Sequence, residues 1–133
     1  MIINLSKADL QKGQIITPGW YKCEIIDFVS KPSKDQQSVN YTPHFKLETP
    51  NEEVIDNHNF NSKAPGFMTD FLAAMAGKTR KEFLDSLASD GVKVDTDSYK
   101  GKKLQIKVKN AVFEGRMKNE LEGFLPYGAE VPF

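Results

Sequence analysis

The segment from Lys103 to Lys109 constrains the fold most, because apolar and polar side chains alternate along it without a break. Its apolar members are Leu104, Ile106 and Val108. The intervening residues are Lys103, Gln105, Lys107 and Lys109. Strict alternation is typical of a β-strand that has one face in the core and the other in solvent. We therefore expect a strand here with an outward row of lysines.

The chain is expected to turn over residues 110–115, with Phe113 at the loop tip, and to return as a second strand over Arg116–Leu125. The inward face of this returning strand is expected to carry Met117, Leu121 and Leu125. Its outward face is expected to carry Arg116, Lys118 and Phe124.

Two further strands are predicted nearer the N-terminus, at Trp20–Ser30 and Val39–Glu48, and a weaker one at about Val54–Phe60. In the first of them the apolar side chains change faces between Ile25 and Ile26, which predicts a β-bulge. Pro43 has no amide hydrogen, so the second strand should have a free edge near it.

Helices are predicted between the third and fourth strands. Phe67, Phe71, Leu72 and Met75 have helical spacing, and Thr79 with Glu82 forms a capping-box pattern for a second helix. Residues 1–17 are expected to form a leader that lies against the body of the protein.

These elements predict a mainly β single domain over residues 1–133, in which a helical insert (64–90) separates strands one to three (18–62) from strands four and five (100–126). Five strands with a helix between the third and fourth is the connectivity of the oligonucleotide-binding (OB) β-barrel. The same order of elements also permits another α+β sandwich.

Charge is unevenly distributed in a chain that carries 18 basic and 18 acidic residues. Residues 100–118 hold seven basic residues and one acidic residue, Glu114, whereas residues 48–61 and 119–133 contain acids without Lys or Arg. No apolar stretch approaches the length of a membrane span, and no signal peptide is evident. A single cysteine, Cys23, cannot form an internal disulfide, so a cytoplasmic location is expected.

No residue pattern predicts catalysis. Two histidines and one cysteine cannot supply the four N or S ligands of a structural zinc site, and no nucleophile is paired with a base. We therefore expect a protein that is not an enzyme and that requires no metal or cofactor.

The pattern that does point to a ligand is basic residues interleaved with aromatic ones, because single-stranded DNA presents phosphates together with unpaired bases that stack on rings. The basic or hydrogen-bonding candidates are Lys22, Lys31, Lys34, His44, Lys46, Lys103, Lys107, Lys109, Arg116 and Lys118. The stacking candidates are Trp20, Tyr41, Phe60 and Phe113. Alternating lysines also keep an exposed sheet soluble, so the stripe alone does not establish DNA binding.

Three short motifs give the chain a resemblance to known proteins. They are the opening Pro18–Ile25, the segment Tyr99–Leu104 and the closing Asn119–Pro126. With them the chain resembles the small single-stranded DNA-binding proteins of bacteriophages. The resemblance implies an OB barrel that binds single-stranded DNA with little sequence preference during phage replication or recombination.

The C-terminal residues Pro132 and Phe133 are similar to the end of bacterial single-stranded DNA-binding proteins, whose acidic tails dock on replication and repair enzymes. A terminal phenylalanine offers a ring and a carboxylate to one pocket. This tail departs from that pattern, since Glu130 is its single acidic residue among the last seven.

Two other functions fit the same sequence: a protein–protein adaptor or inhibitor of a host enzyme that binds no nucleic acid, and a structural component of a phage particle. The sequence also leaves open whether the chain forms a homo-oligomer.

Overall fold

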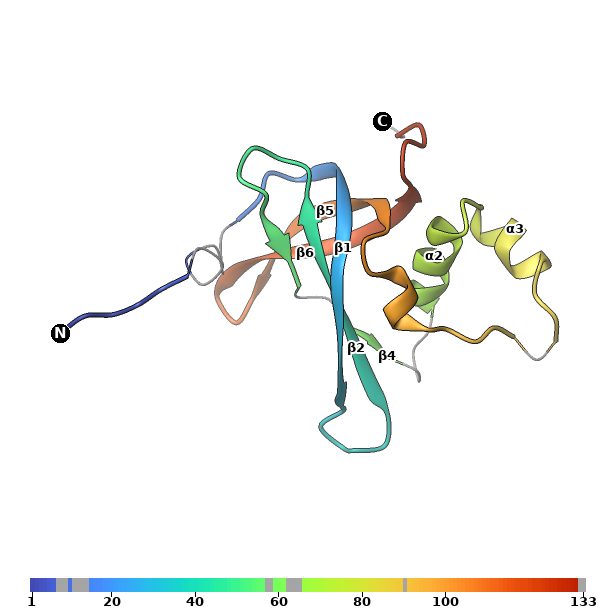
Figure 1. The fold of residues 1–133 in the computed structure, drawn as a ribbon, viewed down its shortest axis with the longest axis horizontal. Helices are drawn as coiled ribbons and strands as arrows, with labels where there is room; N and C mark the ends of the chain where they lie inside the picture. The colour runs from blue at the N-terminus through green and yellow to red at the C-terminus, as the bar shows by residue number, and fades with distance from the viewer. Residues whose placement is uncertain (7–9, 11–14, 57–58, 62–65, 90, 132–133) are drawn as a thin grey trace.

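The computed structural model describes residues 1–6, 10, 15–56, 59–61, 66–89 and 91–131, and an antiparallel β-sheet dominates them (Figure 1). The strands are β1 (Gly19–Pro32), β2 (Val39–Leu47), β3 (Val54–Ile55), β4 (Phe60–Asn61), β5 (Lys103–Phe113) and β6 (Arg116–Pro126). The helices are α2 (Gly66–Met75), α3 (Arg80–Asp85) and the 3₁₀ turn η1 (Thr96–Tyr99). None of the described helices is long and apolar enough to cross a membrane.

The strand order is β3-β2-β1-β5-β6, and β4 also pairs with β2. The expected mainly β architecture, with helices before the last two strands, is confirmed. Among the described residues no ladder joins β6 to β3 or β4, so the sheet is open rather than closed into a barrel. The OB barrel therefore stays a prediction.

Aromatic packing bridges the gap between the two sides of the open sheet. The ring of Phe124 on β6 lies 5.9 Å from that of Phe60 on β4 and 4.9 Å from that of Phe67 on α2. Phe71 of α2 lies 5.1 Å from Phe60 and 5.5 Å from Phe124, measured between ring centroids. Helix α2 thus seals the core where the strands do not pair.

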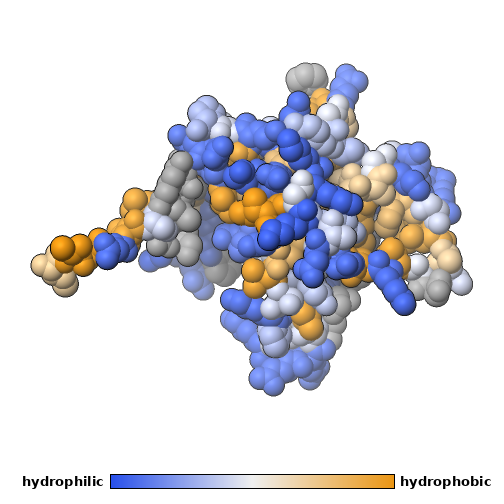
Figure 2. All heavy atoms as spheres, in the orientation of Figure 1, coloured by the Kyte–Doolittle hydropathy of each residue, from blue (hydrophilic) through white to orange (hydrophobic). Residues whose placement is uncertain are grey.

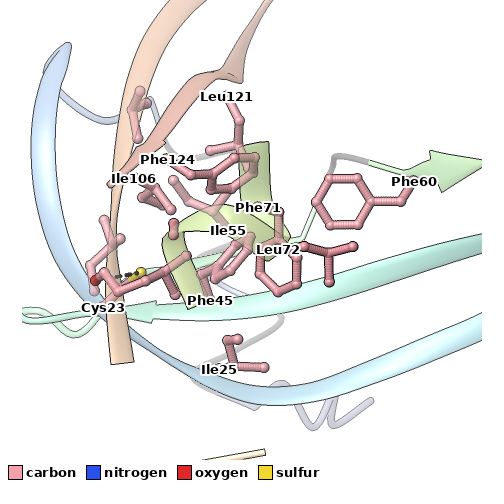
Figure 3. Close-up of a cluster of buried hydrophobic side chains, with 14 of the residues drawn as sticks. Cys23, Ile25, Phe45, Ile55, Phe60, Phe71, Leu72, Ile106, Leu121 and Phe124 are labelled. Atoms are coloured by element: carbon pink, nitrogen blue, oxygen red, sulfur yellow. Dashed lines mark hydrogen bonds between the residues drawn. The ribbon is translucent and has the colours of Figure 1, made fainter. Parts of the chain in front are cut away.

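The core itself is formed by the inward side chains of β1, β2, β5 and β6 together with α2 (Figure 3). Cys23, Ile25, Phe45, Phe71 and Ile106 are fully buried in it. Burial of this kind is the main favourable term in folding. In β5 the prediction is confirmed, because Leu104, Ile106 and Val108 are buried whereas Lys103 and Lys109 are exposed.

The predicted bulge in the first strand is confirmed. The register of β1 against β2 shifts between Ile25, which lies opposite Phe45, and Asp27, which lies opposite His44. Ile26 is the extra residue. The free edge expected at Pro43 also agrees with the pairing, since β4 pairs with β2 at Asn40–Tyr41 and β3 pairs with it at Phe45–Lys46, on either side of this proline.

The predicted faces of the last strand are wrong in part. The register of β6 shifts at Glu122, because Val108 lies opposite Leu121 whereas Lys107 lies opposite Gly123. This extra residue turns Phe124 into the core, where it is 7% exposed. Leu125, expected inside, pairs with Gln105 instead. Met117 is 53% exposed, because this end of the hairpin extends beyond the core.

The predicted leader, residues 1–17, differs from expectation at its start, and residues 7–9 and 11–14 lie outside the described part of the chain. Residues 1–6 are exposed and extend away from the body, where their apolar side chains stand out (Figures 1 and 2). Ile16 lies against the body: it is buried, and its amide donates to Asn119 Oδ1 at 2.9 Å.

The capping box predicted at Thr79 is confirmed. The threonine hydroxyl accepts from the amide of Glu82, and the carboxylate of Glu82 accepts from the amide of Thr79 at 3.0 Å. These bonds satisfy two amides that have no partner within the helix. They also lower the pKa of the Glu82 carboxyl, because the charged form is the better acceptor.

Candidate nucleic-acid interface

The outward face of β5 carries predicted binding residues beside outward residues of both neighbouring strands. Lys107 lies between Trp20 of β1 and Gly123 of β6. Lys103 lies opposite Glu24 of β1. Because residues i and i+2 of a strand point to the same side, their amines follow one another at intervals of about 6.6 Å or a multiple of it.

The row continues along the β5–β6 hairpin. Lys109 lies opposite Glu120, Ala111 opposite Lys118 and Phe113 opposite Arg116. Cross-strand partners share one face of a sheet, so Arg116 and Lys118 lie on the same side as Lys109. We call the outward surface of Lys103, Lys107, Lys109, Arg116 and Lys118 the cationic face.

Trp20 lies at the edge of the cationic face, over β6. A Cβ placed on Gly123 would be 3.4 Å from the ring atom Cη2 of Trp20, so the indole reaches across β5 to the backbone of β6. The backbone of Gly123 does not need glycine, since its φ is not positive. Glycine at this position gives the indole its room.

Carboxylates lie among these lysines. Lys107 is 3.6 Å from Glu122, Lys103 is 3.7 Å from Glu48, and Lys46 is 3.9 Å from Glu24. The side chains are between 34 and 49% exposed, and pairs this long and this exposed contribute about 0–1 kcal/mol. These acids offset part of the positive charge of the lysines, but the ion pairs are too weak to hold the lysine side chains in place.

The C-terminal segment covers one end of the cationic face. Gln105, 3% exposed, donates from Nε2 to the carbonyls of Pro126 and Ala129, both at 2.9 Å. The ring of Tyr127 lies 5.4 Å from Lys22 Nζ and 5.5 Å from Lys103 Nζ. Its hydroxyl donates to the carboxylate of Glu48, 3.0 Å away, which raises the pKa of the Tyr127 phenol.

A second group of predicted residues lines a hollow of about 530 Å³ beside the β1–β2 hairpin. The predicted members are Lys31, Lys34 and His44. The remaining lining residues are Val29, Pro32, Asn40, Thr42, Asp56 and Asn59. We call this space the hollow. The imidazole Nδ1 of His44 lies 2.7 Å from Asp27, which fixes the ring at its edge.

The hollow and the cationic face are connected along β2. Asn40, Thr42, His44 and Lys46 alternate with the inward side chains of that strand, so they form one outward row. Lys46 then lies opposite Glu24 of β1, which lies opposite Lys103 of β5. The two groups of predicted residues are therefore parts of one surface.

Two of the rings proposed for stacking face the wrong way. Phe60 is 1% exposed and packs against Phe71 and Phe124, so its prediction as a stacking residue is wrong. Tyr41 is half-buried and packs on the core, on the face of β2 opposite to His44. Trp20 is the one ring of the proposed set that lies outward among the described side chains.

Three predicted positions lie outside what the structure describes. They are the side chain of Phe113 and the residues Pro132 and Phe133.

The residues that the sequence did not single out are Gln105, Tyr127 and the remaining lining of the hollow. Asn40 and Thr42 had a detectable signal, because they alternate with His44 and Lys46 on the polar face of the second strand. No sequence pattern indicated Asp56 and Asn59, because their position depends on the path of the chain between β3 and β4.

The described part of the chain offers no cluster of metal ligands, and its cysteine is buried. No group of three or more His, Cys, Asp or Glu side chains in the described part of the chain could hold a metal ion. Cys23 is fully buried, and burial strongly raises the pKa of its thiol, so it is a poor nucleophile.

Comparison with known proteins gives no family model and no curated sequence that matches this chain.

Proposed function

We propose that the protein binds single-stranded DNA on the cationic face, with little sequence preference, and coats it during phage replication or recombination. The observation that supports this most is the position of Trp20, whose indole lies beside Lys107 in the outward row of lysines. Unpaired strands need both elements, since cations neutralise phosphates and a flat ring stacks on a base.

The ion pairs on the face are compatible with this role. A phosphate group can replace a carboxylate at 3.6–3.9 Å from an exposed lysine, because such a pair contributes little free energy. The acids would then limit affinity and exclude weakly charged ligands. Neutrality of the whole chain is therefore no obstacle to a local track for phosphates.

Quenching of Trp20 fluorescence tests the proposal directly, because this is the single tryptophan of the chain. Titration with poly-dT should quench the emission, duplex DNA of equal length should quench it much less, and affinity should fall steeply with salt. The slope of log K against log salt should be about −0.7 per phosphate neutralised. No binding, or binding that salt does not change, would contradict the proposal.

A second candidate function is a protein–protein adaptor or inhibitor, and the exposed apolar leader favours it. Met1, Ile2 and Ile3 are each at least 70% exposed. Neighbouring apolar side chains that are left in water often mark a site that a partner covers. This function predicts a partner that is retained after nuclease treatment and no binding to poly-dT at moderate salt.

The C-terminal residues Pro132 and Phe133 are proposed to dock on replication or recombination proteins. Their deletion should leave affinity for poly-dT unchanged and abolish recovery of such partners. Unchanged recovery would contradict docking without affecting the DNA-binding proposal.

A further inference from the structure

The hollow has a floor and two walls, each from a different part of the chain, which distinguishes it from the open cationic face. Val29 and Lys31 of β1 and Asn40, Thr42 and His44 of β2 form its floor. Pro32 and Lys34, where β1 passes into the loop before β2, form one wall. Asp56 and Asn59, between β3 and β4, form the other wall. The hydroxyl of Thr42 bonds to the amide oxygen of Asn59, which ties this wall to the floor.

The lining combines the chemical groups that one nucleotide needs. Lys31 and Lys34 offer cations for a phosphate, and Val29 and Pro32 offer apolar surface for the face of a base. Amide and hydroxyl groups of Asn40, Thr42 and Asn59 can bond to base edges. A volume of about 530 Å³ lies within the range of small-molecule sites.

Asp56 is the group that a simple phosphate track would not contain. A carboxylate at neutral pH accepts hydrogen bonds and donates none, so it repels phosphate and selects bases that present donors. Guanine presents the adjacent N1–H and N2 amino donors on its Watson–Crick edge, which match both carboxylate oxygens. Thymine presents a carbonyl on either side of its N3–H, so its oxygens would face the acid.

We infer that the hollow takes one unstacked nucleotide of the bound strand, with its phosphate at Lys31 and Lys34, and that Asp56 gives this position a preference for guanine over thymine. The inference rests on the proposed function and adds a base-reading position to a surface that is otherwise tolerant of sequence. Proteins that read single strands recognise unstacked bases by bonds to their Watson–Crick edges.

The test compares a short oligo-dT with the same oligonucleotide carrying one central dG. The protein should bind the dG oligonucleotide about fivefold more tightly, at the lower end of the discrimination of a bidentate pair because the hollow is open to solvent. Asp56→Asn should remove this preference and leave affinity for oligo-dT unchanged or slightly higher. Asp56 is exposed, so the variant should fold normally, which circular dichroism checks.

Glu52→Gln is the matched control, since Glu52 is an exposed acid that does not line the hollow. It should retain the full preference for dG. Titration with dGMP and dTMP, followed by amide NMR, supplies a second measurement: dGMP should shift the amides of Asn40, Thr42 and Asn59 more than dTMP does.

The outcomes separate this inference from the proposed function. Tight binding of both oligonucleotides without a preference, or a preference that persists in Asp56→Asn, would overturn the base-reading position and leave DNA binding intact. Failure of the protein to bind any single strand, measured by Trp20 quenching, would overturn both.

Discussion

The ammonium nitrogen of Lys107 lies 3.6 Å from a carboxylate oxygen of Glu122 on the neighbouring strand. Lys107 also lies opposite Trp20, so this pair is at the centre of the proposed DNA track. The two side chains are 41 and 44% exposed, and the pair is held weakly enough for a phosphate to displace the acid. Under the proposed function, the strength of this ion pair therefore affects how strongly the face attracts DNA.

Removal of this acid should strengthen binding. We expect Glu122→Gln to raise affinity for poly-dT about two- to fivefold at low salt, because phosphate no longer competes with a carboxylate for Lys107. Trp20 quenching across a salt series measures the effect, which should shrink as salt rises. Asp85→Asn is the control, because it removes an acid from an ion pair with Lys81 on α3. Equal gains in both variants would contradict a local effect.

A large side chain at position 123 should displace the indole. Gly123→Leu places atoms where the ring of Trp20 now lies, so tryptophan emission should shift to the red and affinity for poly-dT should fall toward that of Trp20→Ala. Gly123→Ala should change little, because its Cβ would be at an ordinary contact distance of 3.4 Å. An unchanged emission maximum in Gly123→Leu would show that the ring does not depend on this glycine.

Gln105→Ala should destabilise the fold by about 1–3 kcal/mol, because two carbonyls, those of Pro126 and Ala129, lose their buried donor. Denaturant unfolding measures the change in the free energy of unfolding. The C-terminal segment should also be trimmed faster by carboxypeptidase. Unchanged stability with an unchanged trimming rate would mean that these bonds do not hold the segment in place.

Loss of the N-cap of α3 should lower the free energy of unfolding by about 1 kcal/mol, which is the usual effect of replacing an N-cap threonine by alanine. Thr79→Ala tests this by denaturant unfolding at neutral pH.

The carboxyl of Glu82 should make the stability of the fold depend on pH. Its pKa is lowered in the folded state, so the stability that it contributes is present at neutral pH and is lost as pH falls through that lowered pKa. The difference in stability between wild type and Glu82→Gln should therefore shrink in acid. A difference that is constant with pH would contradict the capping box.

Cys23 should not react with a thiol reagent in the folded protein. It is 0% exposed, and burial raises the pKa of its thiol, so little thiolate is present at neutral pH and no reagent can reach it. Titration with Ellman's reagent should detect one thiol in concentrated guanidinium chloride and none on the same timescale in buffer. Rapid native reaction would mean that the sheet opens between β1 and β5.

Local patterns predicted the fold well where one physical effect decides the structure. The alternation from Lys103 to Lys109 places Leu104 and Ile106 inside because a strand has a period of two. The capping box at Thr79 needs only a hydroxyl and a carboxylate three residues apart. The bulge at Ile26 was visible because the apolar side chains change faces there.

Predictions failed where contact with an element distant in sequence determines which way a side chain faces. Phe60 looked like an available ring, yet α2 and Phe124 cover it, and no local pattern indicates that contact. The faces at Phe124 and Leu125 were inverted because one extra residue, Glu122, shifts the register. The lysines of the candidate site were predicted, because alternation along a strand determines which face of the sheet they occupy. The wall that carries Asp56 was not predicted, because its position depends on the path of the chain between β3 and β4.

The extra residue in β1 lets Lys31 line the hollow while Trp20 and Lys22 stay on the outward side of the strand, beside the cationic face. Without this bulge, a regular strand over the same residues would carry Phe28 into water and Lys31 toward the interior. The two halves of this strand thus contribute to different parts of the outward surface, the first beside the lysines of β5 and the second at the hollow.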